Sequence, residues 1–138
     1  MSLIPTTILT GFLGSGKTTF CNALLQCIPS HERLLVIETI HELIVGPPNH
    51  VLLEADDEQG YSINRLLVSA LRGLPHRIII GEVRGSEAYS LLKAANTGHP
   101  GAIATLHANS AIDSLERLED MVFEGRPEMP LLAIRRRI

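Results

Sequence analysis

The segment from Gly11 to Thr18 reads Gly-Phe-Leu-Gly-Ser-Gly-Lys-Thr, which has the residue types and spacing of a phosphate-binding loop. Glycines let a chain wrap closely around an anion, so that successive backbone N–H groups and a helix N-terminus face the phosphates. Lys17 adds a positive charge near the β- and γ-phosphates, and the Thr18 hydroxyl can bind Mg²⁺. We therefore expect a nucleoside triphosphate to be bound by Gly11, Gly14, Ser15, Gly16, Lys17, Thr18 and Thr19.

Two carboxylates follow apolar runs that we expect to be strands. Glu38 comes directly after residues 34–37, and Glu82 follows residues 77–80 by one glycine. Ligands of open α/β sheets bind at the carboxyl ends of the strands, so both acids should flank the phosphate loop. We predict that Glu38 activates the attacking water and that Glu82 lies on the Mg²⁺ side with Thr18, although the reverse assignment stays open. A solvent-exposed Glu38, or a Glu82 that caps a helix or pairs with Arg84, is the simpler structural alternative.

His107 ends another apolar run, at residues 102–106. A lone histidine at such a place is more often a hydrogen-bonded core residue than a ligand, so its surroundings must decide between the two interpretations. His99 lies in a Gly-His-Pro-Gly turn, where a structural role is the simpler hypothesis.

The elements that position these side chains alternate between strand and helix. The strands are continuous apolar runs, and such runs are typical of buried strands in a parallel sheet. We predict an α/β fold with a mainly parallel sheet of about five to seven strands and helices on both faces. Ser62, Ser86 and Ser110 should cap helices. The expected strands are 6–10, 34–37, 51–53, 77–80 and 102–106, and the expected helices are 18–28, 63–71, 86–96 and a helix after Ser110.

Composition restricts the class of protein. The chain has 138 residues, of which 45% are hydrophobic and 20% charged, so one domain over residues 1–138 can bury a core. A net charge of −3 argues against direct nucleic-acid binding. Cys21 and Cys27 should lie on different faces of one helix, which indicates no disulfide or metal site and favours a reducing, cytoplasmic location. Residues 1–16 have the features of neither a signal peptide nor a membrane span.

The sequence contains four motifs, whose order and spacing are informative together. They are the phosphate loop, residues 35–38 with Glu42 and Leu43, residues 77–85 and residues 97–110. Together they resemble the secretion ATPase superfamily, which includes type II and type IV secretion ATPases, conjugal-transfer ATPases and pilus motors. The resemblance covers roughly residues 6–138 and is greatest to the conjugal-transfer and type IV branch.

The resemblance implies a RecA-like P-loop core that hydrolyses ATP with Mg²⁺ as a motor. It also implies a homo-oligomeric, hexameric ring, cytoplasmic or peripheral at the inner membrane, with secretion-machine proteins as partners. By resemblance, Glu82 is the Walker B acid at the end of the strand beside the phosphate loop, and Glu38 belongs to the acidic box for water activation. His107 falls in the histidine box that contacts the γ-phosphate, and Arg84 falls at the arginine position after the Walker B acid.

This chain departs from the family pattern at several points. Thr39 replaces an aspartate that usually follows Glu38, and Asn64 replaces an arginine. By resemblance, we expect residues 1–138 to lack the family's N-terminal domain and to stop at Ile138 within a helix. We therefore expect slow hydrolysis unless the chain oligomerises.

Two other functions remain as alternatives. A nucleotide-binding module without hydrolysis is favoured by Thr39 and the missing domain. A metallochaperone-type P-loop GTPase is suggested by residues 9–14, but guanine recognition there needs [NT]-K-x-D. The only lysines are Lys17 and Lys93, and neither lies in such a motif.

Overall fold

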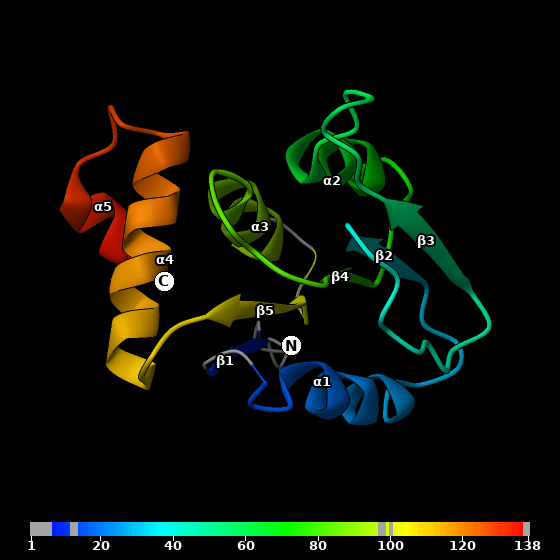
Figure 1. The fold of residues 1–138 in the computed structure, drawn as a ribbon. Helices are drawn as coiled ribbons and strands as arrows, with labels where there is room; N and C mark the ends of the chain where they lie inside the picture. The colour runs from blue at the N-terminus through cyan, green and yellow to red at the C-terminus, as the bar shows by residue number, and fades with distance from the viewer. Residues whose placement is uncertain (1–6, 12–13, 97–98, 100, 137–138) are drawn as a thin grey trace.

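The computed structural model describes residues 7–11, 14–96, 99 and 101–136. Its strands form a five-stranded sheet with the order β1-β5-β4-β2-β3, and every pairing between neighbours is parallel (Figure 1). This confirms the predicted α/β class and parallel sheet. The strands are β1 (Thr7–Gly11), β2 (Leu34–Glu38), β3 (His50–Glu54), β4 (Arg77–Ile80) and β5 (Ile103–His107).

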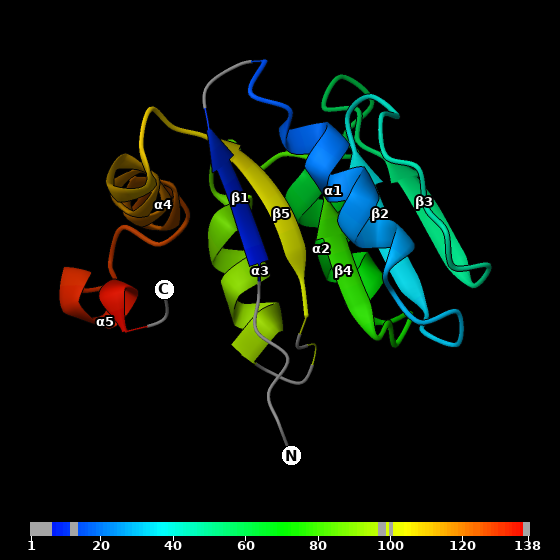
Figure 2. The same ribbon diagram turned by 90° about the horizontal axis from the view of Figure 1, so that it is seen from below.

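Helices cover both faces of this sheet, as predicted. In Figures 1 and 2, α1 lies against one face, and α2 and α3 lie against the other. Helix α4 packs against α3 and α5, and it also contacts β1 at the edge of the sheet. The helices are α1 (Lys17–Gln26), α2 (Ile63–Leu71), α3 (Glu87–Asn96), α4 (Ala111–Gly125) and α5 (Leu131–Arg135).

Alternate residues of the strands enter two separate apolar clusters. Ile78 and Ile80 of β4 belong to the larger cluster under α2, α3, α4 and α5, whereas Ile79 belongs to the smaller one with α1. All three side chains are fully buried, which explains the uninterrupted apolar run. The two edge strands are the exceptions: the residues of β1 are half-buried, and those of β3 are half-buried or exposed. The expectation of a buried first strand is wrong in this respect, and its predicted first residue, Thr6, lies outside the described residues.

Local signals set the helix ends. The side chains of Ser62 and Ser110 accept hydrogen bonds from the N–H groups of Arg65 and Asp113, as their predicted capping roles require. Helix α1 begins at Lys17 of the phosphate-loop motif, and its N-cap is Gly16 with a left-handed φ of 80°. The final helix ends at Arg135, and Arg137 and Ile138 lie outside the described residues.

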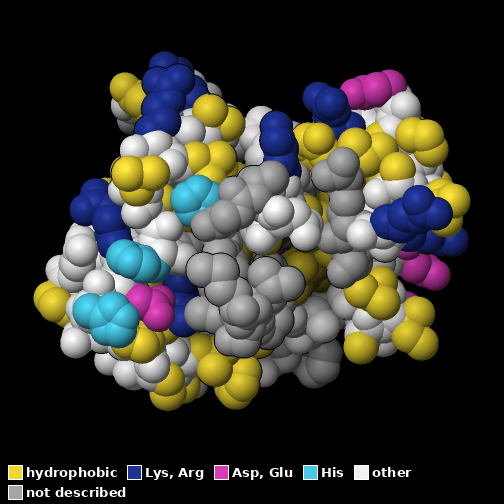
Figure 3. All heavy atoms as spheres, turned by 180° about the vertical axis from the view of Figure 1, so that it is seen from behind, with side chains coloured by type: hydrophobic (Ala, Val, Ile, Leu, Met, Phe, Trp, Pro, Cys, Tyr) yellow, Lys and Arg dark blue, Asp and Glu magenta, His cyan; other side chains and the backbone are white. Residues whose placement is uncertain are grey.

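The surface shows little concentration of one charge on the face seen in Figure 3. There, Lys and Arg side chains stand in separate groups with hydrophobic and other side chains between them. Among the described residues, no helix is long and apolar enough to cross a membrane.

The two cysteines differ sharply in environment. Cys21 is a residue of α1 and is completely buried, whereas Cys27 at the end of this helix is exposed. Burial, assisted by the negative charge of Glu38, raises the pKa of the Cys21 thiol to about 11. Because the thiolate is the reactive form, Cys21 should be inert in the folded protein.

We predict that a thiol reagent at about pH 8 modifies Cys27 but not Cys21 in the folded protein, and both after unfolding in urea. Mass spectrometry of the labelled peptides measures this. The Cys27→Ser variant provides the control, because it should take up label only when unfolded. Equal labelling rates of both thiols in the folded protein would contradict the packing of α1.

Candidate functional site

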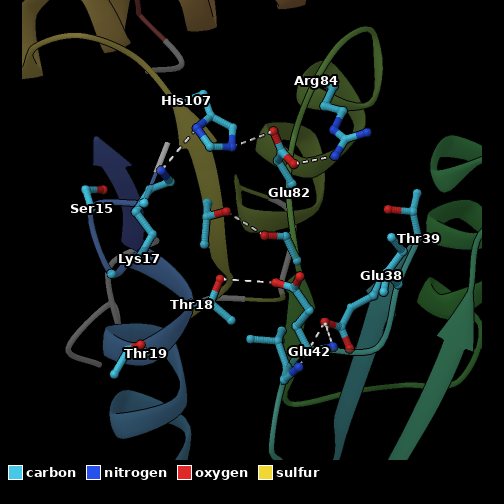
Figure 4. Close-up of a pocket in the computed structure, with 16 residues that line it drawn as sticks. Ser15, Lys17, Thr18, Thr19, Glu38, Thr39, Glu42, Glu82, Arg84 and His107 are labelled. Atoms are coloured by element: carbon cyan, nitrogen blue, oxygen red, sulfur yellow. Dashed lines mark hydrogen bonds and ion pairs between the residues drawn. The ribbon is translucent and has the colours of Figure 1, made fainter. Parts of the chain in front are cut away.

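A cavity of about 480 Å³ lies at the carboxyl ends of the strands, where the phosphate loop was expected to meet the acids (Figure 4). Predicted site residues line it from three parts of the chain: the phosphate loop and α1, the end of β2, and the ends of β4 and β5. Gly11 contributes through its carbonyl group instead, as described below. The predicted residues in the lining are Gly14, Ser15, Gly16, Lys17, Thr18, Thr19, Glu38, Glu82, Arg84 and His107.

The phosphate loop has the backbone that its glycines predict. Gly14 and Gly16 have φ angles of 79° and 80°, which favour glycine over residues with a side chain. The loop leads directly into α1, so the N-terminal N–H groups of the helix are directed toward the cavity. Phe12 and Leu13, in the middle of the motif, lie outside the described residues.

Lys17 joins the phosphate loop to the neighbouring strand. Its Nζ atom donates to the Gly11 carbonyl at 2.9 Å and lies 3.1 Å from Nδ1 of His107. Because an ammonium group only donates, His107 must accept through Nδ1 and carry its proton on Nε2. That Nε2 atom lies 3.2 Å from Oε1 of Glu82, to which it can donate.

Glu82 also pairs with Arg84, whose Nη2 atom lies 2.7 Å from Oε2. The hydrogen bond to Glu82 raises the pKa of the Arg84 guanidinium, so this group stays charged. Lys17, His107, Glu82 and Arg84 therefore form one continuous hydrogen-bonded chain across the cavity, which Figure 4 shows from left to right.

The order of the strands explains this chain and corrects one expectation. The strand beside the phosphate-loop strand β1 is β5, with Gly11 opposite His107 in the register, and β4 comes next. The expectation that the strand before Glu82 lies beside the phosphate loop is wrong. Instead, the histidine lies between the lysine and the acid because its strand lies between theirs.

Glu38 lies at the cavity but is largely engaged by its own loop. Its side chain is only 4% exposed, and its Oε1 atom accepts from the backbone N–H groups of Glu42 and Leu43, both at 3.1 Å. Its Oε2 atom is buried without a hydrogen bond to the described residues, and Nδ1 of His41 lies 3.5 Å from it. Part of this carboxylate therefore fixes the direction of the chain after β2.

Glu42 is the acid that our sequence reasoning failed to assign. Its Oε2 atom accepts from the Thr18 hydroxyl at 3.3 Å, so it faces the residue expected to bind Mg²⁺ (Figure 4). The available signal was a second glutamate in the same acidic box, four residues after Glu38. That signal could not decide between them, because residues 39–48 have no regular periodicity.

Two further expectations concern His99 and the departures from the family pattern at Thr39 and Asn64. Nδ1 of His99 lies 3.0 Å from the Pro75 carbonyl, which supports a structural role, while Thr97, Gly98 and Pro100 lie outside the described residues. Of the two residues that depart from the family pattern, Thr39 lines the cavity and Asn64 does not. Asn64 instead accepts a hydrogen bond from Ser90 on α3.

The donors and acceptors of this cavity fit a magnesium nucleotide. A loop of backbone amides and one lysine suits the phosphates, while a hydroxyl and carboxylates are the oxygen ligands that Mg²⁺ and its waters prefer. The parallel sheet, the phosphate loop at its carboxyl edge and the facing acids define the core of a P-loop NTPase.

Comparison with known families identifies the class further. The family model for Type II/IV secretion system protein matches residues 5–133, nearly the whole sequence. The chain therefore belongs to the type II/IV secretion ATPase family. This membership supersedes the metallochaperone GTPase alternative.

Individual relatives agree with this assignment. The chain is 41% identical over 125 residues to the conjugal transfer protein TrbB of Rhizobium radiobacter. This match covers 88% of this chain and 38% of the relative. It is 42% identical over 138 aligned residues to the type IV secretion system protein VirB11 of Brucella suis. This match covers 94% of this chain and 38% of the relative. The chain thus spans less than half the length of these curated relatives.

Solved structures share the fold. The VirB11 ATPase of Brucella suis, solved with sulphate, superposes with a TM-score of 0.90 at 40% identity, covering 97% of this chain and 40% of that one. The pilus retraction motor PilT, solved with bound ADP, superposes with a TM-score of 0.73 at 26% identity. This match covers 99% of this chain and 38% of that one.

We predict that Gly81→Ala displaces Glu38 and destabilises the fold. A Cβ atom at position 81 would lie 2.9 Å from Cγ of Glu38, so the carboxylate would have to leave the two loop amides. Two buried N–H groups would lose their acceptor, at a cost of about 1–3 kcal/mol in the free energy of unfolding, measured by urea denaturation.

Gly85→Ala is the matched control, because its added Cβ atom would meet nothing closer than 3.4 Å. Its free energy of unfolding should stay within about 1 kcal/mol of the parent value. If both variants were equally stable, Glu38 would not be held as described.

Proposed function

We propose that residues 1–138 form the ATPase core of a type IV secretion or conjugal-transfer motor, which binds Mg·ATP and hydrolyses it. One observation carries this proposal: Lys17 and Thr18 face Glu42, Glu82 and His107 across a single cavity. The names of the relatives support the machine, and the sulphate and ADP in the related structures support an anionic nucleotide ligand.

Each side chain has a role that follows from its chemistry. The backbone N–H groups at the start of α1 and the ammonium group of Lys17 would bind the phosphates, which would draw Lys17 away from His107. The Thr18 hydroxyl would bind Mg²⁺, whose charge would offset that of the phosphate oxygens. With Nδ1 released and Nε2 still held by Glu82, His107 would accept a hydrogen bond from water at Nδ1. It would donate from Nδ1 to a phosphate oxygen only in its doubly protonated form.

The roles that we propose for the acidic residues differ from those predicted from the sequence. We assign to Glu42 and Glu82 the orientation of the attacking and metal-bound waters, because both have carboxylate oxygens at the cavity beside Thr18 or His107. Glu38 instead holds the loop that carries Glu42. In hydrolysis, water would form a new P–O bond to the γ-phosphorus, the bond to ADP would break, and a carboxylate would accept the proton.

We predict that Glu42→Gln lowers the rate of phosphate release about 100-fold or more while Mg·ATP still binds. Gln keeps the size of the side chain but cannot accept a proton. Glu38→Gln should have a smaller effect, because a Gln Oε1 atom can still accept from the two loop amides. Calorimetry measures binding, and a phosphate-release assay measures turnover.

Two controls complete this test. Lys17→Ala should lose most Mg·ATP binding, and Glu58→Gln, in the exposed loop after β3, should behave like the parent. A parent protein that binds Mg·ATP but releases phosphate only at the Lys17→Ala rate would instead be the non-hydrolysing module. No binding by the parent at millimolar Mg·ATP would refute the proposal altogether.

We further propose that the chain works in a homo-oligomeric ring with secretion-machine proteins, in the cytoplasm or at the inner membrane. The relatives' type IV secretion and conjugal-transfer names support this context. Arg84 also supports it, since its side chain is 63% exposed at the rim of the site, where a neighbouring copy could reach it.

We predict that phosphate release per chain rises with protein concentration, because a neighbouring copy would complete the charge around the phosphates. Turnover measured alongside analytical ultracentrifugation tests this prediction. A strictly monomeric protein with full turnover at every concentration would contradict the ring.

A further inference from the structure

Three polar side chains on α1 form a stripe along one side of the helix. Thr18, Asn22 and Gln26 are spaced four residues apart, so they lie above one another on the same face. All three contact the loop that follows β2, between residues 42 and 46. The helix that opens at the phosphate loop is therefore joined along its length to the loop that carries Glu42.

Asn22 makes two of these contacts in opposite directions. Its Oδ1 atom accepts from the backbone N–H of Ile44 at 2.8 Å, and its Nδ2 atom donates to the backbone carbonyl of Glu42 at 3.3 Å. A side-chain amide is the group that can do both, because it carries a donor and an acceptor side by side. The contact fixes the backbone at Glu42 itself and two residues later.

Gln26 extends the same attachment one turn further. Its Nε2 atom donates to the Ile44 carbonyl at 2.9 Å. Gly46 leaves room for this side chain, since a Cβ atom there would lie 2.7 Å from Oε1 of Gln26. Beneath these polar contacts, Leu43 is buried in the apolar cluster that includes Cys21 and Leu25 of α1.

We propose that Asn22, supported by Gln26, is a positioning residue that sets the distance between Glu42 and Thr18. Asn22 itself lies outside the cavity lining and acts through the loop backbone. This inference rests on the proposed function, since it assigns a purpose to Glu42 in Mg²⁺-dependent hydrolysis. The loop has no regular secondary structure of its own, so its position depends on Glu38 from the β2 side and on this stripe from the α1 side.

The first arm of the test measures the loop without nucleotide. Amide hydrogen exchange at Ile44, followed by NMR, should be about threefold to tenfold faster in Asn22→Ala than in the parent, because the Ile44 N–H loses its acceptor, Oδ1 of Asn22. Gln26→Ala should also loosen the loop, because it removes the donor to the Ile44 carbonyl without touching Asn22. Asn64→Ala removes the same group from α2 and should leave the exchange of Ile44 unchanged.

The second arm measures Mg²⁺ dependence. Asn22→Ala and Gln26→Ala should raise the Mg²⁺ concentration for half-maximal phosphate release about threefold to tenfold. The KM for ATP at saturating Mg²⁺ should stay within about twofold of the parent, because the phosphate loop is intact. A merely structural role would lower stability without moving this Mg²⁺ dependence.

The outcomes separate the inference from the function. If the parent binds and hydrolyses Mg·ATP but both variants keep its exchange rate or its Mg²⁺ dependence, the positioning role is wrong and the proposed function stands. If the parent neither binds nor hydrolyses Mg·ATP, the proposed function is wrong and the positioning role falls with it. Should Asn22→Ala fail to fold, Gln26→Ala decides alone.

Discussion

The site depends on a carboxylate that is almost completely buried. Removing a charged group from water is costly unless other groups stabilise it, and Glu38 obtains two backbone N–H groups from the loop that follows its own strand. This contact turns the chain back over the sheet directly after β2. Residue 42 is thereby brought to the beginning of α1, where its carboxylate meets Thr18. The lack of a side chain at Gly81 leaves the space that Glu38 occupies.

The second constraint is the order of the parallel strands. Side chains that follow neighbouring strands at their carboxyl ends must lie close together, and β1, β5 and β4 are consecutive in the sheet. The order of the strands alone therefore places Lys17, His107 and Glu82 in sequence. Since Lys17 only donates, the protonation of both histidine nitrogens follows from its position. A ligand that attracts Lys17 would free Nδ1 of His107, which is the next member of this chain.

Sequence patterns predicted much of this architecture. The alternation of apolar runs with helical periodicity predicted the class of fold, and the glycine spacing predicted the backbone of the phosphate loop, since both signals are local. The neighbours of each strand are not local information, which is why β5 was not expected beside β1. Likewise, Glu38 and Glu42 are both acids near the end of β2. Only the packing of Leu43 and the hydrogen bonds from the loop amides distinguish Glu38, which holds the loop, from Glu42, which faces Thr18.

The charges around the cavity support our proposal that a single copy of this core is a weak catalyst. Among the described lining residues, the permanent cations are Lys17 and Arg84, and they face the carboxylates of Glu38, Glu42 and Glu82. Arg84 is already paired with Glu82, so its charge is partly neutralised before a nucleotide arrives. A triphosphate would add several negative charges to this cavity, and Mg²⁺ offsets only two of them. Stabilising the further charge that develops in phosphoryl transfer requires additional cations, and a neighbouring chain in a ring is a direct way to supply them.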